Sequence, residues 1–173
     1  MQPAVSDSDV IIHLAKLNEL SLIKELYGCA NIPEYVRSEM VRYQYKEAEL
    51  IEEAIYQGIL KVHKTGGIRA KELAKRHGIH TGEGHVKELA EKLKAEIFLS
   101  NEKKVRIAAK TEGFIVVGTI GVILRCVTQN LLTIKEATGL LEELRGDEFR
   151  IHPDIINKAI NSCTRLLEHG FKG

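Results

Sequence analysis

The chain has 173 residues, 44% of them hydrophobic, so it is long enough to bury the core of one folded domain. Its formal net charge of +1 excludes a global attraction to nucleic acid or membranes, so any polyanion contact depends on local patches. The absence of Trp and an aromatic content of only 5% argue against base stacking on an aromatic platform as the mode of recognition.

The cysteines and the N-terminus indicate a cytoplasmic protein. Cys29, Cys126 and Cys163 are far apart and odd in number, which predicts free thiols in a reducing compartment rather than a disulfide framework. The N-terminus lacks the basic segment of a secretory signal. The longest apolar run, residues 114–124, is shorter than the ~20 residues that a membrane helix needs, so we expect no membrane partner.

Short apolar runs alternate with helical patterns over residues 1–130. This alternation predicts βα units and a three-layer α/β/α domain with a mostly parallel sheet. Strands are expected at 4–6, 29–32, 59–62, 97–99 and 114–117, and helices at 10–17, 20–26, 33–56, 68–76, 83–93, 102–111 and from about 119 to 130.

Residues 131–173 form a different pattern. Thr133 and Glu136 make a capping box, which predicts a helix that continues to about residue 145. A final helix is expected from His152-Pro153-Asp154 to Gly170. We interpret this segment as a C-terminal helical extension that packs on the same domain.

Acidic or amide side chains follow the apolar runs or lie at helix starts. Asp7 follows the first run, Glu39 lies early in the helix expected from residue 33, and Glu83 lies in a glycine-flanked turn. Asn101 and Glu102 follow the run 97–99. Strand ends of a parallel sheet converge at one edge, and carboxylates gathered there repel each other unless a cation joins them. The pattern predicts a divalent-metal site suited to phosphoryl chemistry.

Each acid also has a purely structural interpretation. Asp7 could cap the helix that follows, although Asp9 is the better candidate for the cap by position. Glu39 could be one surface acid on a charged helix, and Glu83 could serve only the start of its helix. The glycines beside Glu83 allow close backbone approach, which favours a site.

Three histidines and one glycine motif are further candidates for a binding site. His77, His80 and His85 are spaced across a glycine-rich turn with no Cys nearby, which disfavours structural zinc. His85, beside Glu83, would suit proton transfer or phosphate contact. The motif 118–121, Gly-Thr-Ile-Gly, lacks the remaining residues of a dinucleotide or Walker loop, and tight strand-to-helix packing explains its glycines.

Lys103, Arg106 and Lys110 share one face of the helix expected at 102–111. They are either a solvated face or phosphate contacts beside the metal site. Four further basic residues are candidates for a second wall of such a site: Arg69, Lys71, Lys75 and Arg76.

The ordered set of segments resembles PIN-domain proteins. Residues 5–17 and 32–40 resemble the first strand and helix and the second acidic segment of that family. Gly82-Glu83, the run 97–99, Asn101-Glu102, the basic residues 103–106 and Gly-Thr-Ile-Gly at 118–121 follow in the order seen in a prokaryotic, often archaeal, subfamily with extra C-terminal helices.

The resemblance implies a metal-dependent nuclease fold related to the toxin ribonucleases of toxin–antitoxin pairs. It places the family acids on Asp7, Glu39 and Glu83, with Mg²⁺ or Mn²⁺ as the cofactor. Asn101 falls where the family usually has Asp, and Glu102 matches the second acid of that pair. His85 is a second departure, because the subfamily commonly has an acid there. The implied partners are RNA, an antitoxin protein and a second copy of the chain.

The acidic residues and the resemblance together give three candidate functions. The first is a divalent-metal-dependent endoribonuclease that hydrolyses RNA phosphodiester bonds. The alternative, motivated by Asn101, is a catalytically degenerate PIN-like module that binds RNA or a protein. A third is a small phosphatase or nucleotide-binding protein of similar sheet topology.

Overall fold

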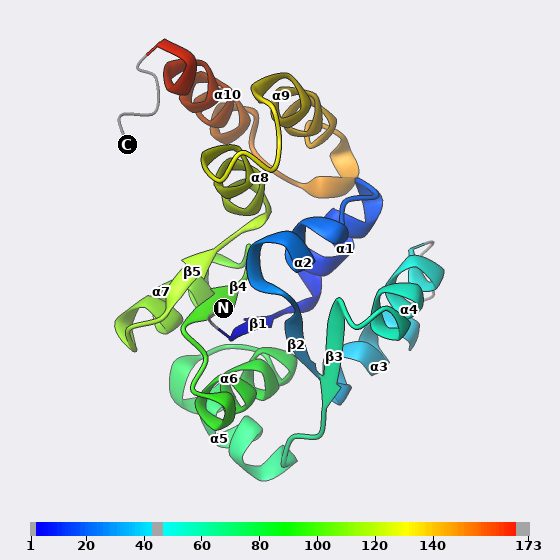
Figure 1. The fold of residues 1–173 in the computed structure, drawn as a ribbon. Helices are drawn as coiled ribbons and strands as arrows, with labels where there is room; N and C mark the ends of the chain where they lie inside the picture. The colour runs from blue at the N-terminus through cyan, green and yellow to red at the C-terminus, as the bar shows by residue number, and fades with distance from the viewer. Residues whose placement is uncertain (1–2, 43–46, 169–173) are drawn as a thin grey trace. The chain divides into compact units, whose positions relative to one another are not determined.

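The computed structural model describes residues 3–42 and 47–168. By its internal contacts the chain divides into two compact units, Met1–Thr119 and Ile120–Gly173. The first unit contains the whole sheet (Figure 1). The domain boundary that we expect after residue 130 stays a prediction.

The sheet of the first unit is parallel throughout. Every residue of β1, β2 and β4 is buried, because a parallel sheet is covered by helices on both faces. The strand order is β3-β2-β1-β4-β5. The strands are β1 (Ala4–Ser6), β2 (Ala30–Pro33), β3 (Leu60–His63), β4 (Ile97–Leu99) and β5 (Ile115–Val117).

Helices cover the two faces in two sets. The chain moves outward in one direction from β1 to β3 and returns in the other from β3 to β5, so right-handed crossovers place α1–α4 on one face and α5–α7 on the opposite face. In Figure 1, α5 and α6 lie across the strands from α1 and α2. This confirms the three-layer α/β/α prediction. The helices are α1 (Ser8–Lys16), α2 (Ser21–Tyr27), α3 (Glu34–Arg42), α4 (Ala48–Tyr56), α5 (Gly67–His77), α6 (Thr81–Leu93) and α7 (Lys103–Thr111).

Helices α5 and α6 approach each other very closely at Gly84. A Cβ atom at Gly84 would overlap the carbonyl oxygen of Ala70 on α5 and would lie 3.1 Å from the Cβ atom of Ala74. Since α6 also packs on β1 and β2, this contact fixes where α6 begins relative to the sheet. The sequence argument that the glycines around Glu83 allow close backbone approach is confirmed at Gly84, whereas Gly82 is approached by the side chains of Glu39 and Tyr35.

The second unit consists of helices. They are α8 (Thr119–Thr128, whose first residue belongs to the first unit), α9 (Ile134–Glu143), a 3₁₀ turn (Asp147–Phe149) and α10 (Pro153–Glu168). The capping box is confirmed, because the Glu136 amide donates to the Thr133 hydroxyl at 3.2 Å and the Thr133 amide donates to the Glu136 carboxylate at 2.8 Å. Helix α9 packs against α10. The predicted helix end at Gly170 lies outside the described residues.

One predicted element differs from the structure. The pattern at 33–56 predicts a single helix opened by Pro33, but two helices, α3 and α4, occupy this stretch, and residues 43–46 lie outside the described part. Pro33 instead ends β2, where it pairs with His63 of β3. In the part of the chain that the structure describes, no helix is both long enough and apolar enough to span a membrane.

Candidate active site

The strand order reverses between β1 and β4, and ligands of open parallel sheets bind outside the carboxyl ends of the strands at such a point. Ser6 pairs with Leu99, so Asp7 and Ser100 leave the sheet side by side. The Asp7 amide donates to the Leu99 carbonyl at 3.1 Å, which continues the ladder by one bond. The fold therefore places a carboxylate at the position where ligands of this sheet class bind.

Asp7 is 5% exposed and caps α1, because its carboxylate accepts a hydrogen bond from the Val10 amide at 3.4 Å. The prediction that Asp9 is the cap is therefore wrong. Burial, together with the nearby carboxylates of Asp9 and Glu83, raises the pKa of Asp7 to about 7, although hydrogen bonds from Ser100 and Val10 oppose the rise. Asp7 is thus a buried acid under repulsion from its neighbours.

Glu83 lies in the first turn of α6 and serves two purposes. Its carboxylate accepts a hydrogen bond from the His80 amide at 2.7 Å, which caps the helix. Partial burial raises the pKa of Glu83, and the carboxylates of Glu102 and Asp9 add to the rise against the opposing His80 amide. The capping interpretation is correct, but it does not account for the acids that face Glu83.

Four carboxylates therefore act on one another at this edge, and we call Asp7, Asp9, Glu83 and Glu102 the acid cluster. Glu102 is exposed at the N-cap of α7, and its amide donates to the Ser100 hydroxyl at 3.2 Å. Sequence reasoning missed Asp9 as a cluster member. The alternation Ser6-Asp7-Ser8-Asp9 was the available signal, because a strand end and the first helical turn can bring both acids to one edge.

Glu39 approaches the cluster from α3. Its Oε2 atom lies 2.9 Å from the position that a Cβ atom of Gly82 would occupy, so its carboxylate rests against the residue that precedes Glu83. Of the sequence-predicted acids, Asp7 and Glu83 interact with each other, and Glu39 lies against Gly82, the residue before Glu83. Within residues 3–42 and 47–168, no group of three His, Cys, Asp or Glu side chains is arranged to hold a metal ion.

Asn101 is held by three hydrogen bonds. Its carbonyl oxygen accepts from the Thr119 amide at 2.9 Å, at the first residue of α8. Its NH₂ group donates to the Thr119 hydroxyl at 3.0 Å and lies 3.3 Å from Nδ1 of His13. An amide supplies both a donor and an acceptor here, whereas a carboxylate supplies acceptors only.

His13 matches this arrangement electrostatically. Burial, with a smaller contribution from Lys16, lowers the pKa of His13 to about 4, so its ring is neutral near neutral pH. A neutral ring leaves one nitrogen as an acceptor for the Asn101 NH₂ group. Asn101 thus joins the end of β4 to α1 and to Thr119 through uncharged groups.

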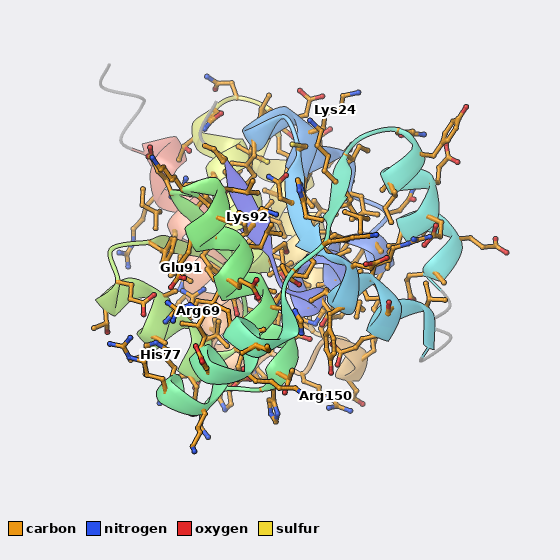
Figure 2. All side chains as sticks on the ribbon, turned by 90° about the horizontal axis from the view of Figure 1, so that it is seen from below. Lys24, Arg69, His77, Glu91, Lys92 and Arg150 are labelled. Carbon is orange, nitrogen blue, oxygen red and sulfur yellow. The ribbon has the colours of Figure 1, made fainter. Side chains whose placement is uncertain are left out.

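The three predicted phosphate contacts on α7 have different surroundings. Arg106 donates to the Ser100 carbonyl at 2.9 Å and is partly buried, so it supports the end of β4. Lys103 and Lys110 are exposed on the same helix. Of the basic residues of α5, Arg69 is less available to a phosphate, because it pairs with Glu91 at 3.2 Å (Figure 2).

The three histidines of the zinc alternative have separate surroundings. The ring of His85 hydrogen-bonds to the Thr65 hydroxyl at 2.6 Å, and burial is the main cause of its lowered pKa. The Nε2 atom of His77 lies 3.1 Å from the carboxylate of Glu112, which also pairs with the buried Lys87. His80 is the N-cap residue of α6.

The comparisons with known proteins agree with this architecture. The sequence model of the PIN domain matches residues 3–165. Among solved structures, the crystal structure of PAE2754 from Pyrobaculum aerophilum is similar, with a TM-score of 0.50 and 14% sequence identity over 73% of this chain and 96% of that chain. At that identity the likeness concerns the fold alone. No curated protein matches the chain.

Proposed function

The chain belongs to the PIN-domain family, whose fold is a nuclease fold, and from this premise we propose that it is an endoribonuclease that uses Mg²⁺ or Mn²⁺. The observation that carries the proposal is the acid cluster at the point where the strand order reverses. Burial, and then the neighbouring acids, raise the pKa of Asp7 there, and a divalent cation would relieve the repulsion between the acids.

The donor set fits a hard cation, because it consists of carboxylate oxygens. Asp7, Glu83, Glu102 and Glu39 are the residues that would hold it, and a bound ion would acidify a water molecule and stabilise charge on the scissile phosphate. Ser100 fixes Asp7 by a hydrogen bond, and the capping bond to His80 fixes Glu83. Glu102 is exposed, so its side chain has room to turn toward the ion.

The test is cleavage of single-stranded and structured RNAs with Mn²⁺, comparing the wild-type protein with Asp7→Asn. The variant keeps the size and capping oxygen of Asp7 but removes its charge. We expect a rate at least roughly 100-fold lower, the scale of losing one preorganised electrostatic group.

Asp147→Asn is the matched control, since Asp147 is exposed and belongs to the second unit. Its cleavage rate should equal that of the wild type. Equal rates for Asp7→Asn and the wild type would place the chemistry elsewhere.

Asn101 favours a second candidate function, a PIN-like binding module without cleavage. Its carbonyl oxygen accepts the Thr119 amide and its NH₂ group faces His13, so its contacts are those of a neutral structural residue. RNA binding by the wild type with no Mn²⁺-dependent cleavage would support this function. The nuclease proposal includes a role as the toxin of a toxin–antitoxin pair. Its proposed partners are RNA, an antitoxin protein and a second copy of the chain.

Lys103 and Lys110 are the residues proposed to contact RNA phosphates, because both are exposed on α7, the helix whose N-cap is Glu102. Reversing both to Glu should weaken RNA binding about 10-fold or more and reduce the slope of log affinity against log salt by about 2, one for each lost phosphate contact. Lys104→Glu is the control, because Lys104 is exposed on another side of the same helix. An unchanged salt slope in the double variant would identify these lysines as solvated surface.

A further inference from the structure

Tyr35 is an exposed aromatic residue whose ring is held in place. It is the second residue of α3, and 39% of its surface is exposed. Its ring stacks on that of His85, with centroids 4.5 Å apart and planes inclined by 12°. One face of the ring is therefore covered by His85, while the residue as a whole keeps part of its surface exposed.

His85 makes this support rigid. It is 6% exposed, and its Nδ1 atom hydrogen-bonds to the Thr65 hydroxyl at 2.6 Å. An imidazole fixed by both burial and a hydrogen bond gives the stacked tyrosine ring a fixed support. A ring that is ordered before binding loses little conformational freedom when a ligand stacks on it.

The ring lies beside the candidate active site. Its Cε1 atom is 3.4 Å from the position that a Cβ atom of Gly82 would occupy, and Oε2 of Glu39 is 2.9 Å from the same position. Gly82 directly precedes Glu83 of the acid cluster. Thus a partly exposed aromatic residue, a candidate metal ligand and the start of α6 share one small region.

We infer that Tyr35 stacks on an unpaired base of the nucleotide that flanks the scissile phosphate. The inference rests on the proposed function, because the acid cluster sets where the phosphate lies. Stacking requires a base outside a duplex, since paired bases offer no free face. The low aromatic content of the chain argues against a platform of several rings, whereas one fixed ring is sufficient for one base.

Binding is measured in EDTA, so that no cleavage occurs, with a labelled single-stranded RNA that cannot pair with itself. Tyr35→Leu removes the ring and keeps an apolar side chain, whereas Tyr35→Phe keeps the ring. We expect Tyr35→Leu to weaken binding by about 5- to 100-fold, the usual range for one stacked base, and Tyr35→Phe to bind as the wild type does. A duplex of the same sequence should bind both variants equally.

A second measurement locates the base. 2-Aminopurine is placed at each position of the RNA in turn, and its fluorescence should be quenched by the wild type and by Tyr35→Phe at the nucleotide that flanks the Mn²⁺-dependent cleavage site. Unchanged affinity of Tyr35→Leu, or quenching that persists in it, would overturn the inference, as would absence of RNA binding by the wild type. Tyr35-dependent binding without Mn²⁺-dependent cleavage would support the base contact and contradict the nuclease proposal.

Discussion

Asp7→Asn is expected to make the protein more stable at about pH 8 in the absence of divalent ions, although it should remove cleavage. Burial and neighbouring acids raise the pKa of Asp7 from 3.8 to about 7, so the folded state holds this proton more tightly than the unfolded state does. The ionised carboxylate therefore opposes folding. The free energy of unfolding should be about 4 kcal/mol higher in the variant, because this is the free energy that corresponds to the pKa shift of Asp7.

The pH dependence follows from the sign of the shift. At pH values well below 3.8, Asp7 is largely protonated in both states, so the wild type and the variant should be equally stable. As the pH rises toward about 7, the unfolded chain releases the proton while the folded protein keeps it, and the wild type loses stability relative to the variant. Urea unfolding of both proteins across this range, in EDTA, measures the difference.

Added Mn²⁺ gives an independent check. A cation that binds the folded acid cluster stabilises the wild type by mass action, and Asp7→Asn should gain much less. A stability difference that is the same at every pH would show that Asp7 titrates normally. Equal stabilisation of both proteins by Mn²⁺ would remove Asp7 from the proposed ligands.

Much of the fold could be predicted because the signals are local. Apolar runs at residues 4–6 and 97–99 are short, continuous and bounded by polar residues, and both are strands of the observed sheet. The capping box at Thr133 is correct for the same reason. The single helix predicted at 33–56 is wrong, because helical periodicity does not show where a chain leaves one helix and begins another.

The site could be predicted only in part. The position of Asp7 after β1 follows from the order of strands, but the choice between Asp7 and Asp9 as the cap depended on backbone geometry at residues 6–8 that composition does not encode. The role of Asn101 depends on His13 and Thr119, which are 88 and 18 residues away in the sequence. Contacts of this range have no local signal.

Gly84→Ala is expected to destabilise the first unit by about 3 kcal/mol or more, the upper range for overpacking a tight contact. The new methyl group would overlap the carbonyl oxygen of Ala70 and would lie 3.0 Å from its carbonyl carbon, so it meets backbone that cannot rotate away. Gly67→Ala, at the first residue of α5 with no atom within 4 Å of the new Cβ atom, is the control and should be neutral or slightly stabilising.

Because α6 carries Glu83, a folded Gly84→Ala protein should also lose Mn²⁺-dependent cleavage. Thermal or urea unfolding that shows equal stability for both variants would mean that α5 moves aside readily, and that the contact at Gly84 does not fix the position of Glu83.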